Sequence, residues 1–242
     1  MDDITLYVIG VLFLATLVRS TFGFGEALVA VPLLVLRVPV EVAVPVAALL
    51  SVVVAAGVLV QDAALVDVRS AAWLVATTIV GVPVGLYVLR RVDDQLVKLA
   101  LAAVIILFSG WSLVSRTKPR LGTSRGPLAV TGLVAGVLGG AYGMNGPPLV
   151  VYGALRGWDP RQFRATLQAY FLPASLAGVI GYGASGMLTH EVWRDLAWCG
   201  PGVVVALFAG RALNRRLDTK TFVRWVHAAL IVIALGLVAQ SA

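Results

Sequence analysis

Apolar runs separated by short charged or Pro/Gly-rich breaks take up most of this sequence. A helix needs about 20 apolar residues to cross a bilayer core of roughly 30 Å. The eight main runs of this kind are Ile4–Arg19, Val42–Val60, Ala71–Leu89, Leu96–Ser115, Leu128–Ala141, Arg164–Tyr182, Trp193–Leu213 and Phe222–Ala239. The chain is 60% hydrophobic and only 13% charged, whereas a soluble domain is about 25% charged. We therefore expect an all-α, multi-pass membrane protein with about eight transmembrane helices, located in the cell inner membrane.

Two glycine-rich motifs interrupt the apolar pattern, one in each half of the chain. The first is Thr21-Phe-Gly-Phe-Gly-Glu26, and the second runs from Gly139 to Pro148. Broken backbone of this kind survives at membrane depth only where it is buried in protein or lines a watery cavity. Matching breaks in two halves of a membrane protein indicate a transport site. The apolar pieces that follow, 27–36 and 148–155, are too short to cross alone, so we expect a re-entrant or discontinuous segment in each half.

The two halves of the chain look like repeats. A shift of 120 residues places Phe22-Gly23-Phe24 over Tyr142-Gly143-Met144, and Gly85 and Gly210 each stand five residues before an Arg-Arg pair. We predict two related four-segment halves, residues 1–115 and 126–242, joined by a basic linker at 116–125. Whether the repeats are parallel or inverted stays open.

The basic residues are best interpreted as topology signals. The net charge is +7, but Lys and Arg lie between apolar spans rather than on one face, so we expect no nucleic-acid partner. With eight crossings, Arg156 falls on the same side as the Arg90-Arg91 pair, and Arg69 and the linker fall on the other. The loop counts favour termini outside the cytoplasm, but the basic linker opposes this, so the orientation stays open.

Glu26 is a carboxylate within apolar sequence, which costs at least a few kcal/mol unless it faces a partner or cavity or is protonated. One interpretation is a proton-coupling or gating residue, paired with Arg19 one or two turns away. The other is an acid in the first turn of a helix over 27–36, where the helix dipole favours it. The two interpretations are compatible.

The second motif has the features of a helix start. Asn145 precedes Gly146-Pro147-Pro148, and Asn before a helix with Pro in its first turn is a common beginning. A helix start is also an anion site, because its N–H groups and dipole are positive. If Ala27 and Pro147 both open half-helices toward a common centre, two such ends would hold one small anion.

Arg164 and Gln168 share a face of the following helix at a spacing of four residues. The planar guanidinium of Arg matches an oxyanion, so Arg164 is the best cationic candidate, with a topology anchor as the alternative. The candidate substrate-binding residues are Phe22, Gly23, Phe24, Gly25, Tyr142, Gly143, Met144, Asn145, Gly146, Arg164 and Gln168, with Glu26 for coupling.

At these motifs the sequence resembles the TauE/SafE family of membrane permeases, the sulfite exporter group. The resemblance is carried by Phe22-Gly-Phe-Gly25 with Pro32, by Gly143-Met-Asn-Gly-Pro-Pro-Leu149 and by 159–166. It implies a secondary transporter for small sulfur-containing anions such as sulfite or sulfoacetate, without an organic cofactor. Glu26 stands where a small residue is common in the family, which favours proton coupling or a different substrate.

Other function classes find little support in the sequence. Cys199 is the only cysteine, His190 and His227 are far apart, and no hydrolytic, metal-binding or nucleotide-binding motif occurs. We therefore expect no enzyme, no metal and no cofactor. The expected partners are a small anion and the lipid bilayer, and a homodimer is left open. The alternative is a channel or carrier for another small solute.

Overall fold

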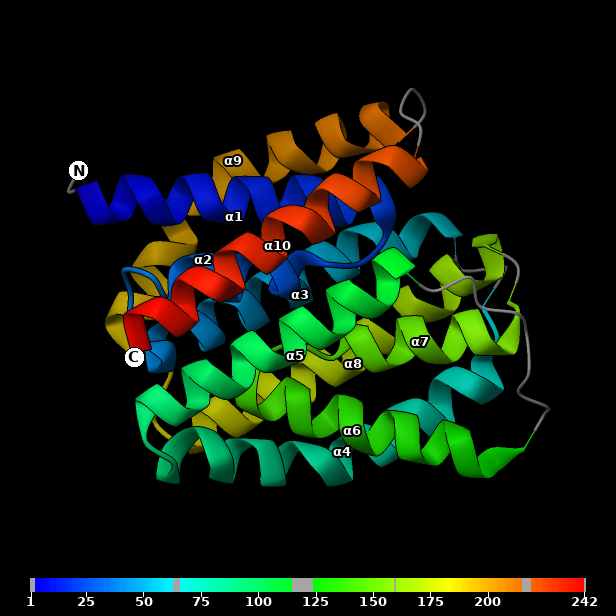
Figure 1. Ribbon diagram of the computed structural model, residues 1–242. Helices are drawn as coiled ribbons and strands as arrows, with labels where there is room; N and C mark the ends of the chain where they lie inside the picture. Colours follow the sequence, from blue (N-terminus) through cyan, green and yellow to red (C-terminus); the bar gives the residue numbers. More distant parts are fainter. Residues whose placement is uncertain (1–2, 63–65, 115–123, 159, 215–218, 242) are drawn as a thin grey trace. The chain divides into compact units, whose positions relative to one another are not determined.

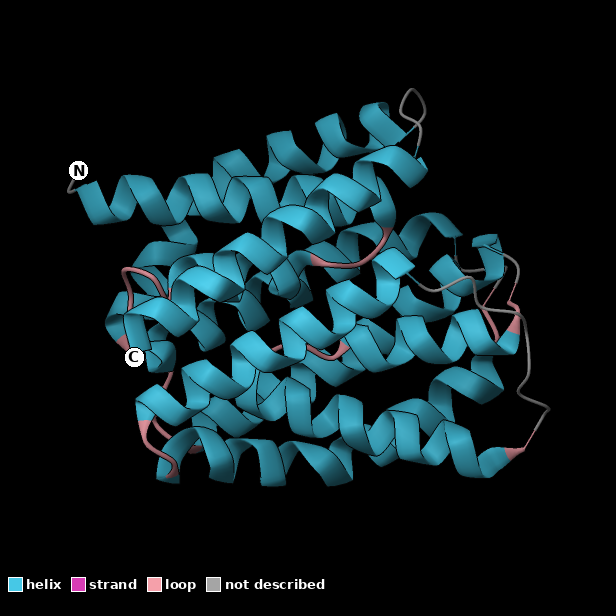
Figure 2. Cartoon of the chain, viewed as in Figure 1, coloured by secondary structure: helices cyan, strands magenta, loops and turns pink. Residues whose placement is uncertain are grey.

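The computed structural model describes residues 3–62, 66–114, 124–158, 160–214 and 219–241. Within these ranges the chain forms ten helices joined by short loops, and no strand (Figures 1 and 2). The helices are α1 (Asp3–Phe22), α2 (Glu26–Leu34), α3 (Val40–Asp62), α4 (Val68–Arg91), α5 (Asp94–Val114), α6 (Arg125–Tyr142), α7 (Gly146–Arg156), α8 (Pro160–Ala184), α9 (His190–Asn214) and α10 (Thr219–Ser241).

The predicted all-helical fold is confirmed, and each apolar run coincides with one helix. The two short pieces that follow the motifs form α2 and α7, of 9 and 11 residues. By length and composition, five of the described helices can cross a membrane: α1, α3, α4, α5 and α9. A shorter apolar stretch, Val226–Ala239, lies within α10.

The helices form two compact units that do not follow the two sequence halves. Unit 1 comprises Met1–Ala47, Arg91–Ser115 and Thr189–Ala242, and unit 2 comprises Ala48–Arg90 and Arg116–Leu188. Helix α4, from the first half, therefore belongs to the unit that contains the second motif. Helices α9 and α10, from the second half, belong to the unit that contains the first motif.

In unit 1, α1 and α2 form a hairpin around the first motif. The Tyr7 hydroxyl, near the start of α1, donates to the Leu33 carbonyl near the end of α2 at 2.6 Å. The Arg37 guanidinium, just beyond α2, lies 4.9 Å from the centre of the Tyr7 ring. Helix α1 also packs along α9, as Figure 1 shows for the blue and gold-orange ribbons. Helix α1 is therefore flanked by α2 and α9, which come from different halves of the chain.

In unit 2, glycines bring α4 and α6 into close contact. A Cβ at Gly81 would lie 2.3 Å from the Leu133 carbonyl oxygen, and one at Gly136 would lie 2.2 Å from the Thr78 carbonyl oxygen. Helix–helix packing without side chains at the contact is typical of membrane proteins, because small residues let two backbones approach. Figure 1 shows α4 lying beside α6. Helix α7 then turns back along α6.

The glycines matched between the two halves make corresponding contacts. A Cβ at Gly85 of α4 would lie 2.1 Å from the Val137 carbonyl oxygen of α6. A Cβ at Gly210 of α9 would lie 2.8 Å from the Leu17 carbonyl oxygen of α1. Val137 and Leu17 differ by the same 120 residues that separate the motifs. In each unit, therefore, a glycine lets a neighbouring helix pack closely against the helical turn that precedes the motif.

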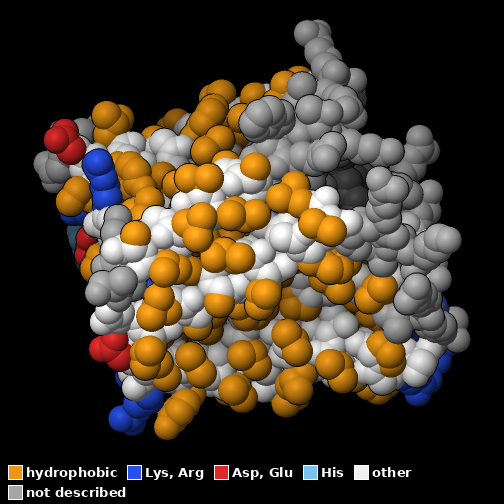
Figure 3. Space-filling model, in the orientation of Figure 1, with side chains coloured by type: hydrophobic (Ala, Val, Ile, Leu, Met, Phe, Trp, Pro, Cys, Tyr) orange, Lys and Arg blue, Asp and Glu red, His pale blue; other side chains and the backbone are white. Residues whose placement is uncertain are grey.

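The described surface is strongly apolar. Leu107, Ile180 and Phe208 have exposed fractions of 73%, 69% and 71%. Hydrophobic side chains cover most of the described surface in Figure 3, and the visible Lys, Arg, Asp and Glu side chains lie towards its margins. Apolar exposure on this scale marks a surface that contacts lipid rather than water.

Candidate functional site

The two motifs have the same backbone plan. Each is a break of three residues between two helices, 23–25 in unit 1 and 143–145 in unit 2. Each opens with a glycine in the left-handed region, Gly23 at φ 84° and Gly143 at φ 65°. Their N–H groups donate to the carbonyl oxygens of Arg19 and Gly139 at 2.6 and 2.9 Å. Only glycine adopts this conformation without steric cost, which explains why the sequence breaks at these positions.

The second motif is lined by a directional chain of hydrogen bonds. The Asn145 amide Nδ2 donates to the Tyr170 hydroxyl at 3.4 Å, and that hydroxyl lies 2.9 Å from Thr78 Oγ1. Thr78 Oγ1 donates its own proton to the Gly132 carbonyl at 2.8 Å, so Tyr170 is the donor in the middle bond. All three side chains are buried. The chain links α4, α6 and α8 to the start of α7.

Asn145 occupies the predicted position before α7, and the predicted helix start is confirmed, with Pro147 and Pro148 in the first turn. Its side chain makes no capping hydrogen bond. The amide instead packs on Gly139, where a Cβ would lie 2.8 Å from both Nδ2 and Oδ1. The Tyr182 hydroxyl of α8 donates to the Gly139 carbonyl at 2.6 Å. A glycine at 139 therefore makes room for the Asn145 side chain.

The first motif has an ion pair where the second has two glycines. Arg19 NH1 and Glu26 Oε2 form a salt bridge across the break, and their side chains are 2% and 1% exposed. The predicted pairing is confirmed, and Glu26 is also the first residue of α2. Removing one partner of a buried ion pair costs about 3–5 kcal/mol, because the remaining charge is left without compensation. The positions that correspond to Arg19 and Glu26 at the 120-residue offset are Gly139 and Gly146.

The aromatic side chains of the first motif enclose very little space. Phe22, Phe24 and Gly25 line a cavity of about 20 Å³ together with Val18, Leu28, Val226 and His227. That volume suits about one water molecule and is too small for an organosulfonate. His227 is 3% exposed, and its Nδ1 lies 3.1 Å from Ser109 Oγ. Sequence reasoning considered His227 only as a metal ligand and did not anticipate its place beside the motif.

The remaining candidates are mostly buried. Tyr142 and Met144 are 4% and 1% exposed, and Gln168 is fully buried in α8. Gly146 begins α7. The side chain of Arg164 lies outside the described residues, so its predicted contact with the anion stays a prediction.

Three arginines that sequence reasoning did not group converge in unit 2. Arg69, Arg125 and Arg156 line one cavity of about 330 Å³. The loop count placed Arg156 on the opposite side from Arg69 and the linker, and that placement is wrong. The count assumed that a crossing separates Arg156 from Arg125, whereas α7 returns along α6 and brings the two residues to the same cavity.

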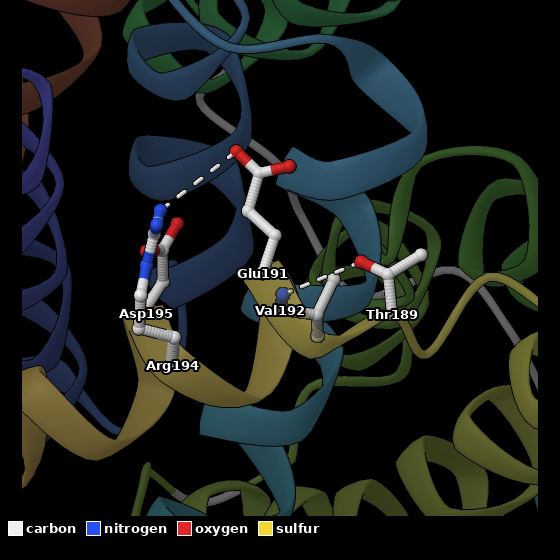
Figure 4. A network of polar contacts seen from close by, with 5 residues as sticks. All are labelled: Thr189, Glu191, Val192, Arg194 and Asp195. Atoms are coloured by element: carbon white, nitrogen blue, oxygen red, sulfur yellow. Dashed lines mark hydrogen bonds and ion pairs between the residues drawn. The ribbon is translucent and has the colours of Figure 1, made fainter.

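Asp195 is a buried carboxylate that sequence reasoning missed. It lies in the second turn of α9 and is 4% exposed, and Arg194 NH2 lies 3.2 Å from its Oδ1 (Figure 4). Arg194 also lies 4.0 Å from Glu191 Oε1, and the Val192 N–H donates to Thr189 Oγ1 at 3.5 Å. This network compensates the buried charge at the start of α9. Among the described residues, no group of three His, Cys, Asp or Glu side chains could hold a metal ion.

Comparison with known proteins decides the family. A model of the family described as "Sulfite exporter TauE/SafE" matches residues 8–237. The chain belongs to this family. The resemblance inferred from the two glycine motifs is thereby confirmed, and the protein is a membrane protein of a transporter family. A relative from Cupriavidus necator, "Probable sulfite/organosulfonate exporter TauE", is 29% identical over 176 residues, covering 71% of this chain and 68% of its own. No solved structure matches.

Proposed function

We propose that this protein is a secondary permease of the cell inner membrane that moves a small sulfur oxyanion or organosulfonate, such as sulfite or sulfoacetate. The observation that carries the proposal is the pair of three-residue helix breaks, each with buried polar side chains, in a chain of the sulfite exporter family. The name of the Cupriavidus necator relative supports the same substrate class.

The proposed membrane architecture has about eight long membrane helices in two related halves, with α2 and α7 as short segments that turn back along α1 and α6. Helices α2 and α7 have 9 and 11 residues, so they are about 14 and 16 Å long, half of a hydrocarbon core of roughly 30 Å. They therefore suit re-entrant segments whose breaks lie near the membrane midplane. Gly85 and Gly210 make corresponding contacts in the two units, which supports two related halves of the sequence. In this arrangement α4 packs in the unit of the second motif and α9 packs in the unit of the first motif.

The second motif is the proposed anion-binding element. Pro147 and Pro148 lack N–H groups, so the start of α7 keeps only two of the usual four free donors. The Asn145 amide and the dipole of α7 then supply the remaining attraction for an anion. Because Asn145 is held by Tyr170, its position is fixed before the anion arrives.

The first motif is the proposed coupling element. A proton arriving at Glu26 would neutralise its carboxylate and weaken the salt bridge with Arg19. The bond spans the break between α1 and α2, so its loss would free the hairpin to move. This gives the motif a two-state element that a proton gradient can bias.

The test is uptake of radiolabelled sulfite, sulfoacetate and thiosulfate into proteoliposomes, with and without a pH gradient. We expect saturable uptake that responds to the gradient in the wild type but not in a Glu26→Gln variant shown to be folded by size-exclusion chromatography. Linear uptake without counterflow would identify a channel instead. No uptake of any sulfur anion by folded protein would remove this substrate class.

A further inference from the structure

We infer that unit 2 carries a second oxyanion site, separate from the glycine motifs, in the cavity lined by Arg69, Arg125 and Arg156. The ligand is a small oxyanion head group, either the sulfonate or sulfite of a free anion or the phosphate of an anionic phospholipid. The inference does not depend on transport. It rests on the size, charge and construction of this cavity.

The cavity has the size of a small-molecule site. Its volume is about 330 Å³, at the lower end of the range of roughly 300–1,000 Å³ for such sites. It is lined by Asp67, Arg69, Ser70, Trp73, Ser124, Arg125, Leu128, Tyr152 and Arg156. Three guanidinium groups, three hydroxyl groups and two aromatic rings therefore face a space that a sulfonate or phosphate group fits.

The charge of the lining favours an anion. Asp67 is its single carboxylate against three arginines. Asp67 Oδ1 accepts the Ser70 N–H at 3.1 Å and Oδ2 accepts the Ser70 hydroxyl at 2.7 Å, so this carboxylate caps the start of α4. Within the described part of the chain, neither Arg69 nor Arg125 forms a salt bridge. The lining thus keeps a net positive charge that an oxyanion would balance.

The arginines come from separate elements that other contacts hold in place. The Arg125 guanidinium lies 5.4 Å from the centre of the Trp73 ring, which joins the start of α6 to α4. The Asp67 N–H donates to Thr166 Oγ1 at 3.0 Å, which joins the residue before α4 to α8. A planar guanidinium binds an oxyanion through two parallel hydrogen bonds. A framework that holds the arginines before binding lowers the entropic cost of that arrangement.

Arginines that serve only as topology anchors need to lie near lipid head groups, but they need not share a cavity. Here residues from the starts of α4 and α6 and the end of α7 line the same space. The start of α6 is about 21 Å along the helix from Gly139. The cavity is therefore a site distinct from the second motif, at the open end of the α6–α7 hairpin.

The test is equilibrium binding to the purified full-length protein in detergent, measured by calorimetry with sodium sulfoacetate and with sodium phosphate at constant ionic strength. We expect saturable binding that weakens at least tenfold in the double variant Arg69→Gln/Arg125→Gln. The matched control is Arg90→Gln, an exposed arginine at the other end of α4, which should bind like the wild type. In Asn145→Ala, the component of binding that the double variant loses should remain, which separates this site from the proposed transport site.

A second arm identifies the source of the oxyanion. The measurement is native mass spectrometry of protein released from vesicles of phosphatidylglycerol and phosphatidylcholine. If a lipid phosphate occupies the cavity, the wild type should retain phosphatidylglycerol and the double variant should retain less. Loss of either soluble-anion or phosphatidylglycerol binding in the double variant supports the site. Equal binding by wild type and double variant in both arms, or none by either, overturns it, whether or not the protein transports sulfite.

Discussion

The buried salt bridge between Arg19 and Glu26 gives the sharpest prediction. Both side chains are almost completely buried, at 2% and 1% exposure, so a substitution of one partner leaves the other charge with little solvent to compensate it. Glu26→Gln and Arg19→Gln should each destabilise the protein by about 3–5 kcal/mol. For a domain of this length, 1 kcal/mol corresponds to roughly 2–4 °C in Tm, so the apparent Tm should fall by about 6–20 °C.

The double variant Arg19→Gln/Glu26→Gln removes both charges and keeps the shape of the site. It should be more stable than either single variant, because no buried charge remains uncompensated. The measurement is the apparent Tm of detergent-solubilised protein by size-exclusion chromatography after heating. Single variants within about 2 °C of the wild type, or a double variant that loses the sum of both effects, would refute the argument from burial.

Three further predictions concern the glycines and the second motif. Gly85→Ala should lower the apparent Tm by about 2–12 °C, since its Cβ would lie 2.1 Å from a carbonyl oxygen of α6, whereas Gly110→Ala, with nothing within 4 Å, should not lower it. Gly143→Ala should cost about 1–2 kcal/mol, seen as a lower Tm in the same heating assay, because φ 65° is left-handed. Tyr170→Phe should reduce saturable sulfite counterflow in proteoliposomes, because Asn145 loses its acceptor; wild-type counterflow from folded Tyr170→Phe protein would contradict this role.

The helices and their breaks were predictable because their causes are local. An apolar run followed by glycine or proline determines where a helix can continue, and each predicted run became a helix whose ends differ by a few residues. The run Leu128–Ala141, for example, is α6, Arg125–Tyr142. The Arg19–Glu26 pair was also predictable, since the partners are seven residues apart and both lie in apolar sequence.

The candidate site was predictable in its backbone but not in its side-chain partners. The break at 143–145 was located from its glycines, whereas the contact of Asn145 with Tyr170 joins residues 25 apart and that of Tyr170 with Thr78 joins residues 92 apart. Nothing local specifies which hydroxyl an amide will meet when several lie on neighbouring helices. The helix start at Asn145 was therefore predictable, whereas the hydrogen bond from its side chain to Tyr170 was not.

The sequence by itself determined that the chain is helical and apolar, that it breaks twice at glycine, and which family it belongs to, because composition and short motifs carry this information. Only the tertiary structure decided that α4 and α9 pack in the unit of the other half, and that Arg69, Arg125 and Arg156 share a cavity. The physical reason is that loop charges are counted along a chain that is assumed to cross at every apolar run. When a short helix such as α7 turns back along the preceding helix, residues that the count places on opposite sides of the membrane come together.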